Sequence, residues 1–77
     1  MIKVLLFAHL TEEAGKDSIE VETDEISVND LKKILQEKHN IKQLDHVMTA
    51  INEEYATNDD KVKSGDIVAL IPPVSGG

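Results

Sequence analysis

The sequence predicts an α+β fold in which one main helix packs on one face of a mixed sheet. Short apolar runs, typical of strands, open and close the chain at residues 2–8 and 67–71. One stretch, residues 27–40, repeats its apolar residues at the spacing of an amphipathic helix. Turn-forming residues separate these segments, as at Ser64-Gly65-Asp66.

The segments before the main helix are expected to pair as a hairpin. Residues 2–8 predict the first strand, and residues 10–15 predict one helical turn ending at Gly15, since glycine suits the left-handed backbone that follows a helix. Residues 18–22 alternate polar and apolar, which places Ile19 and Val21 on the inner face. This second strand is expected to run antiparallel to the first.

The main helix is expected to begin after Ser27, whose hydroxyl can accept a hydrogen bond from the main-chain N–H of Asp30. It is expected to end near His39-Asn40. One stripe of the helix is apolar and should face the sheet: Val28, Leu31, Ile34 and Leu35. The opposite face is polar and is expected in solvent: Lys32, Lys33, Gln36 and Glu37.

The second half of the chain is expected to complete the sheet. Ile41 and Leu44 should fix the loop after the helix, before a third strand at residues 47–52 and a short one at 55–57. A polar loop at residues 58–60, anchored by Val62, leads to the last strand. This order predicts a β-grasp, or ubiquitin-like, fold, with the first and last strands parallel at the centre of the sheet.

Length and composition limit the possible functions. The 77 residues are expected to form one domain at 1–73, followed by a flexible tail at 74–77. The net charge of −7, from 15 acidic and 8 basic residues, argues against nucleic acid and anionic membrane surfaces as partners. It favours a partner with a basic face, although acidity for solubility explains it equally well.

No metal site, bound cofactor or membrane span is expected. The chain has no cysteine, which excludes thiolate nucleophiles and zinc–thiolate sites. The spacing of His9, His39 and His46 matches no helical ligand pair. No apolar run is long enough to span a membrane, and Lys3 lies inside the first strand, so a cytoplasmic location without a signal peptide is expected.

The two central strands are apolar on both faces. If Val4 and Leu6 face the helix together with the matching residues of the last strand, the opposite face is left with Leu5, Phe7, Ala69 and Ile71. A chain with one substantial helix cannot cover both faces, so this second face is expected to be exposed and to bind another protein. The alternative is that short loops fold over it.

The sequence ends in Val74-Ser75-Gly76-Gly77, directly after Pro72-Pro73. Two prolines stiffen the base of such a tail, and two glycines keep its end thin enough to enter a narrow channel on another protein. The group presented there would be the Gly77 carboxylate. Once activated as an acyl-adenylate, this carbon could accept sulfur to form a thiocarboxylate or an amine to form an amide.

Four motifs resemble the small subunit of molybdopterin synthase, a ubiquitin-like sulfur carrier. They are the ending Pro72-Pro73-Val74-Ser75-Gly76-Gly77, the opening Ile2-Lys3-Val4-Leu5-Leu6-Phe7-Ala8, the hairpin Ala50-Ile51-Asn52-Glu53 and the turn Ser64-Gly65-Asp66. The resemblance covers the whole chain, and the tail is its most specific part.

This resemblance implies a sulfur-donating subunit with no catalytic groups of its own. A separate activating enzyme would adenylate Gly77 with ATP, and a sulfur donor would convert it to a thiocarboxylate. The tail would enter the large subunit of the synthase, within a heterotetramer, and deliver sulfur to the pterin precursor in molybdenum cofactor biosynthesis. The family's hydrophobic contacts with the large subunit fall on positions matching Phe7, Tyr55 and Ile71.

Three alternatives stay open. A sulfur carrier for thiamine synthesis or tRNA thiolation would share the fold and the Gly-Gly ending. A ubiquitin-like protein modifier would instead be joined through Gly77 to lysines of its targets. A simple binding module would not require Gly76-Gly77 at all.

Overall fold

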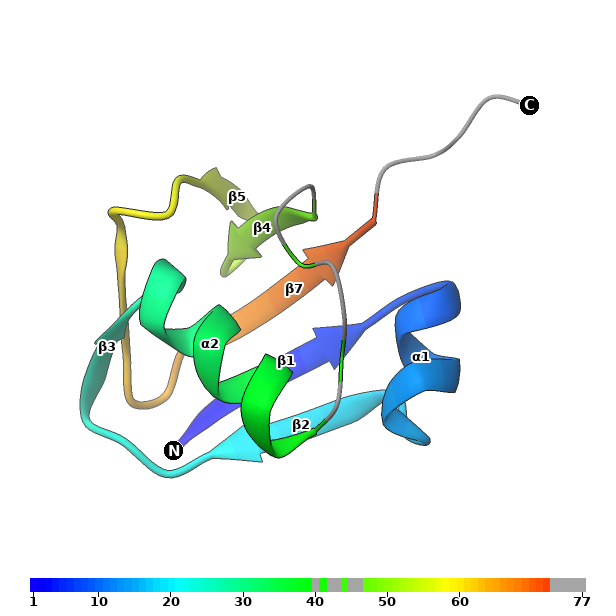
Figure 1. Cartoon of the computed structure of the whole chain (residues 1–77). Helices are drawn as coiled ribbons and strands as arrows, with labels where there is room; N and C mark the ends of the chain where they lie inside the picture. Colours follow the sequence, from blue (N-terminus) through cyan, green and yellow to red (C-terminus); the bar gives the residue numbers. More distant parts are fainter. Residues whose placement is uncertain (40, 42–43, 45–46, 73–77) are drawn as a thin grey trace.

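The computed structural model describes residues 1–39, 41, 44 and 47–72, and these residues form two sheets and two helices (Figure 1). In chain order the elements are β1 (Ile2–Leu6), α1 (His9–Ala14), β2 (Ser18–Val21), β3 (Glu25–Ser27), α2 (Val28–Lys38), β4 (Met48–Ile51), β5 (Glu54–Ala56), β6 (Lys61–Lys63) and β7 (Ile67–Ile71).

The larger sheet has the strand order β2-β1-β7-β4-β5, so the first and last strands of the chain lie side by side in its interior. They run parallel, with Val4 opposite Val68 and Leu6 opposite Leu70. The β1–β2 pair is antiparallel, as the hairpin prediction requires. With α2 lying across one face of this mixed sheet (Figure 1), the arrangement is the predicted β-grasp fold.

The core lies between α2 and the inner face of the sheet. Ser27 begins the helix as predicted: its Oγ accepts a hydrogen bond from the Asp30 N–H at 3.1 Å. The buried helix residues are Val28, Leu31 and Leu35, whereas Ile34 is only half-buried. Ile41 and Leu44, which were predicted to fix the loop after the helix, are buried at 1% and 0% exposure.

A second sheet of two short strands was not predicted. Strand β3, directly before α2, pairs antiparallel with β6, and Ile26 lies opposite the buried Val62. Val62 is fully buried, as expected of an anchor, but it lies in strand β6 rather than beside a loop. Strands of three residues are too short to show an alternating pattern, so their pairing depends on contacts distant in sequence.

The structure corrects two further predictions. Lys32 was expected in solvent but is 8% exposed, and its Nζ donates hydrogen bonds to Asn58 Oδ1 at 2.9 Å and to the Val47 carbonyl at 3.4 Å. Its long apolar stem lets it cross the protein surface while its charged end keeps polar partners. The first strand ends at Leu6 rather than Ala8, because Ala8 has a φ of 54° that no strand residue adopts.

Neither helix in the described part of the chain has the length and apolar composition needed to cross a membrane.

Candidate functional site

The face of the larger sheet that points away from α2 forms a continuous row of side chains across all five strands. Residues directly opposite one another on neighbouring strands share a face. Ser18 is opposite Leu5, Leu5 is opposite Ala69, Ala69 is opposite Ala50, and Ala50 is opposite Tyr55. This row places Tyr55 on the same face of the sheet as Leu5 and Ala69 of the central strands.

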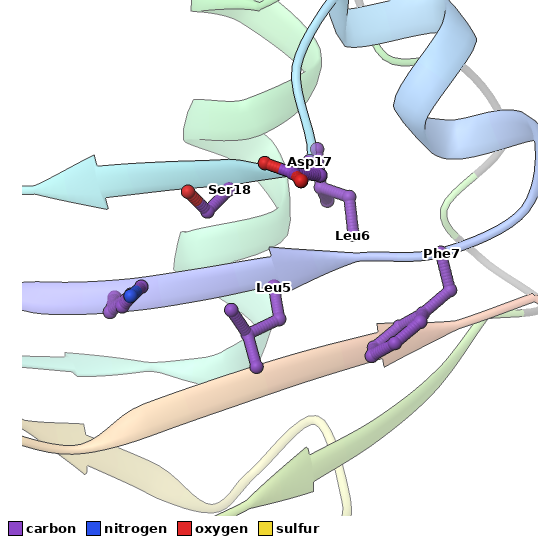
Figure 2. Close-up of a pocket in the computed structure, with 6 residues that line it drawn as sticks. Leu5, Leu6, Phe7, Asp17 and Ser18 are labelled. Carbon is purple, nitrogen blue, oxygen red and sulfur yellow. The ribbon is translucent and has the colours of Figure 1, made fainter.

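A second group of apolar side chains lies on this face near the ends of β1 and β7. Met48 is opposite Ile71, and Figure 2 shows Phe7 and Leu5 projecting from the same side of the chain. The term outer face is used below for the apolar residues of this surface: Leu5, Phe7, Met48, Ala50, Tyr55, Ile67, Ala69 and Ile71.

Four of the eight residues of the outer face are exposed to solvent, and Ala50 is buried at 7% exposure. Phe7 and Ile67 are each 45% exposed, Met48 is 46% exposed and Tyr55 is 73% exposed. Of the four residues predicted to be exposed on this face, Phe7 is exposed, whereas Leu5, Ala69 and Ile71 are half-buried. An apolar surface of this kind, formed by several strands, is typical of a protein-binding site.

The outer face adjoins the point where the chain leaves the sheet. Strands β1 and β7 are parallel, so their carboxyl ends lie at the same edge (Figure 1). Phe7 follows β1 at this edge, and Ile71 and the buried Pro72 end β7 there. The predicted tail residues, Val74, Ser75, Gly76 and Gly77, lie outside the described residues, as does the predicted boundary between domain and tail.

A tight turn places Phe7 at the rim of the sheet. The Leu10 N–H donates to the Phe7 carbonyl at 3.1 Å, and Ala8 between them has φ 54° and ψ −134°. Dihedrals of this kind occur at the first central position of a type II′ turn, where glycine is usual. Leu10 is fully buried, so helix α1, which follows Phe7 in the chain, is attached to the core.

A second turn holds the strand that carries Tyr55. Asn52 and Glu53 join β4 to β5 and have φ values of 50° and 71°, as in a two-residue type I′ hairpin. The Asn52 side chain also bonds to the start of β7: its Oδ1 accepts from the Ile67 N–H at 3.0 Å, and its Nδ2 donates to Asp66 Oδ1 at 3.0 Å. These bonds fix the β4–β5 hairpin to the central strand.

Asp66 completes this network. Its Oδ2 accepts a hydrogen bond from the Lys63 N–H at 2.9 Å. That bond, together with the one from the Asn52 side chain, stabilises the carboxylate and lowers the pKa of Asp66 from its ordinary value of 3.8. The ionised form of Asp66 therefore supports the turn that leads into β7.

The described residues contain no group of three His, Cys, Asp or Glu side chains that could hold a metal ion. His9 Nε2 lies 3.7 Å from a Glu13 carboxylate oxygen, an ordinary contact along a helix, and His46 lies outside the described residues. What these residues can do chemically is present an apolar surface to another protein.

Phe7, Tyr55 and Ile71 were predicted from the sequence as contact residues, and the structure brings all three onto the outer face. Sequence analysis missed Met48, Ala50 and Ile67. Strand β4 is apolar or small at nearly every position, so its alternation did not indicate which residues face outward. The pairing of Ala50 with Ala69 would have revealed the face, but register is a property of the assembled sheet.

Comparison with known proteins places these features in a family. The sequence pattern of the ThiS family matches residues 4–77. A curated relative is the molybdopterin synthase sulfur carrier subunit of Dictyostelium discoideum. It is 39% identical over an alignment of 84 positions that covers 97% of this chain and 94% of the relative.

Solved structures agree with this placement. The crystal structure of SAMP1, a small archaeal modifier protein from Haloferax volcanii, superposes with a TM-score of 0.81 at 32% identity, covering 99% of this chain and 98% of that one. One chain from the protein–protein complex of subunits 1 and 2 of the molybdopterin-converting factor of Helicobacter pylori also superposes. Its TM-score is 0.71 at 27% identity, and the match covers 99% of this chain and 97% of that one.

Proposed function

The chain belongs to the ThiS family, and we propose that it serves as the sulfur carrier subunit of a molybdopterin synthase. The observation that carries the proposal is the position of the outer face. Phe7 and Ile71 lie at the sheet edge from which Pro72 leads toward Gly76-Gly77. A partner that binds this face would therefore also lie close to the start of the tail.

The chemistry is proposed at the Gly77 carboxylate. A carboxylate oxygen attacks the α-phosphorus of ATP on an activating enzyme, pyrophosphate leaves, and an acyl-adenylate forms. Hydrosulfide released by a sulfur donor then attacks the acyl carbon, AMP leaves, and the product is a thiocarboxylate. The folded domain takes no part in bond making; it presents the tail to each partner.

The proposed acceptor of the sulfur is a pterin precursor held by the large subunit of the synthase. In this assembly the large subunit supplies the catalytic groups and the present chain is the sulfur-donating subunit. Two findings support this choice: the name of the Dictyostelium relative, and the likeness to a molybdopterin-converting factor solved as a complex of two subunits.

A protein modifier is the second candidate, because the SAMP1 structure is named as a modifier and superposes closely. The two functions share the activation step and differ in the nucleophile, which is sulfur in one case and a lysine amine in the other. Carriers for thiamine synthesis or tRNA thiolation would share the thiocarboxylate and differ only in the acceptor.

Intact mass spectrometry of the full chain tests the proposal. The chain is incubated with the activating enzyme, ATP and a sulfur source, and we expect a mass gain equal to replacement of one oxygen by one sulfur. A control lacking Gly76-Gly77 should show no gain. Conjugates on lysines without any sulfurated form would overturn the carrier function in favour of the modifier.

The acceptor is tested separately. The sulfurated chain is mixed with the purified large subunit and pterin precursor, and conversion of the precursor is followed. Sulfuration without conversion, combined with transfer to a thiazole precursor or to tRNA, would identify one of the other carrier functions.

A further inference from the structure

We propose that a pocket at one side of the outer face, lined by Leu5, Phe7, Asp17 and Ser18, receives an arginine side chain of the protein that docks there. This inference rests on the proposed function, because it assumes a protein partner on the outer face. Figure 2 shows the pocket: Leu5 lies on β1 and Phe7 directly follows that strand, whereas Ser18 begins the neighbouring strand β2 and Asp17 directly precedes it.

The β1 side of the pocket is apolar and partly aromatic. Leu5 is half-buried, and Phe7 is 45% exposed, so part of the ring is open to a ligand. The hydrogen bond from the Leu10 N–H to the Phe7 carbonyl fixes the main chain beneath this ring. A preformed aromatic surface of this kind suits the stem of a long side chain and the flat face of a guanidinium group.

The β2 side of the pocket supplies a negative charge. Asp17 is exposed, and within the described part of the chain its carboxylate forms no ion pair. Its main chain is held in place, because the Asp17 carbonyl accepts a hydrogen bond from the Leu6 N–H at 2.9 Å. The half-buried Ser18 adds a hydroxyl beside it. A carboxylate carried by a fixed main chain, next to an apolar wall, is complementary to a cation with an apolar stem.

Lys3, the one basic residue that lines the pocket, lies at the far end from Phe7. It is two positions before Leu5 on the same strand, so their Cα atoms are roughly 7 Å apart. It is also directly opposite Glu20 on β2, whose charge offsets its own. The Phe7 end of the pocket therefore keeps the negative potential of Asp17, in a chain whose net charge is −7.

Arginine fits this combination better than lysine or an apolar residue. Its guanidinium group can stack on an aromatic ring and at the same time pair with a carboxylate through two parallel hydrogen bonds. Lysine offers a compact charge without a flat face, and an apolar side chain would leave the Asp17 carboxylate desolvated and unpaired. Arginine is also enriched among the residues that dominate binding energy at interfaces.

Charge substitutions in the full chain test the inference. Binding to the purified large subunit is measured by calorimetry at several salt concentrations. Asp17→Asn should weaken binding by about tenfold and reduce its salt dependence, and Asp17→Lys should weaken it further. The control Glu37→Lys makes the same charge change as Asp17→Lys, but at an exposed position on α2 away from the pocket. It should change binding by less than about twofold.

A double-mutant cycle tests whether Asp17 and Phe7 hold the same side chain. Phe7→Leu keeps an apolar surface but removes the ring. If both residues contact one arginine, the combined loss in Phe7→Leu with Asp17→Asn should be smaller than the sum of the separate losses. The wild-type chain should also protect an arginine of the large subunit from phenylglyoxal, and the Asp17→Asn chain should not.

The outcomes separate this inference from the proposed function. If the wild-type chain binds the large subunit and both Asp17 variants bind equally well, the pocket inference is wrong and the proposed function stands. Tighter binding by Asp17→Lys, or no protected arginine, would also overturn it. Absence of wild-type binding would overturn the docking proposal and the pocket inference together. Thermal melts of each variant check that the fold is retained.

Discussion

The two faces of the larger sheet are built from alternate residues of the same strands, yet they differ in how far their side chains are buried. On β1 and β7 the inward side chains of Val4, Val68 and Leu70 are completely buried. The outward Phe7 and Ile67, equally apolar, are each 45% exposed. The difference does not lie in residue type, because both faces of these strands are apolar. It lies in α2, which covers only the inner face (Figure 1).

This comparison shows how a small domain separates stability from binding. Apolar burial against α2 supplies the driving force for folding. The same kind of surface, left uncovered, remains available for burial against another protein. Substitutions on the two faces should therefore affect different measurements: unfolding free energy for the inner face and partner affinity for the outer face.

Neighbouring residues on β7 give the largest contrast. Leu70→Ala should lower the free energy of unfolding by about 2–5 kcal/mol, because it leaves a cavity in the core. Ile71→Ala, on the half-buried outer face, should cost about 1 kcal/mol or less. Urea denaturation of both variants measures the difference. Equal losses would mean that the isolated chain covers its outer face.

Phe7→Ala should separate binding from stability. We expect affinity for the large subunit to fall by about 2 kcal/mol, or roughly 30-fold, as for an aromatic anchor at an interface. The free energy of unfolding should change by no more than about 1 kcal/mol, since the ring is 45% exposed. Calorimetric titration and urea denaturation of the same preparation give both quantities. A large loss of stability with unchanged affinity would place Phe7 in the core.

Lys32 tests whether a charged residue on the inner side contributes to folding. Lys32→Met keeps the apolar stem but removes the donor to the Val47 carbonyl and to Asn58. Because Lys32 is buried, we expect a loss of about 1–2 kcal/mol in unfolding free energy. Lys33→Met, on the exposed side of α2, is the matched control and should be nearly neutral. A neutral Lys32→Met would show that the hydrogen bonds of Lys32 are dispensable.

Asp66 should give the smallest effect, seen only through pH. Its pKa is lower in the folded chain, so the folded state prefers the ionised carboxylate. The resulting stability is fully present above the ordinary pKa of 3.8 and is lost as pH falls through the lower folded value. Asp66→Asn should therefore lose less stability than the wild-type chain between neutral pH and acid. Thermal melts across that range measure it, and parallel curves would contradict the prediction.

Much of the fold could be predicted because its signals are local. The helix start at Ser27 follows from one hydroxyl and one N–H three residues away, and the turn at Gly15 follows from the freedom of glycine at its φ of 75°. The β3–β6 pair could not be predicted, since neither strand is long enough to show a pattern. The burial of Lys32 was missed for a similar reason: its partners, Val47 and Asn58, are 15 and 26 residues away.

The residues of the candidate site were likewise predictable from the sequence only in part. Sequence alone determined which residues are apolar, that the central strands are apolar on both sides, and that Phe7 and Ile71 belong to the face opposite the core. The assembled sheet was needed to show that Met48 and Ala50 join them, that Tyr55, predicted only through the family resemblance, lies on the same face, and that Asp17 lines the same pocket as Phe7. Hydrophobic periodicity is a property of one strand, whereas a shared surface depends on the register between strands, which forms when distant segments pair.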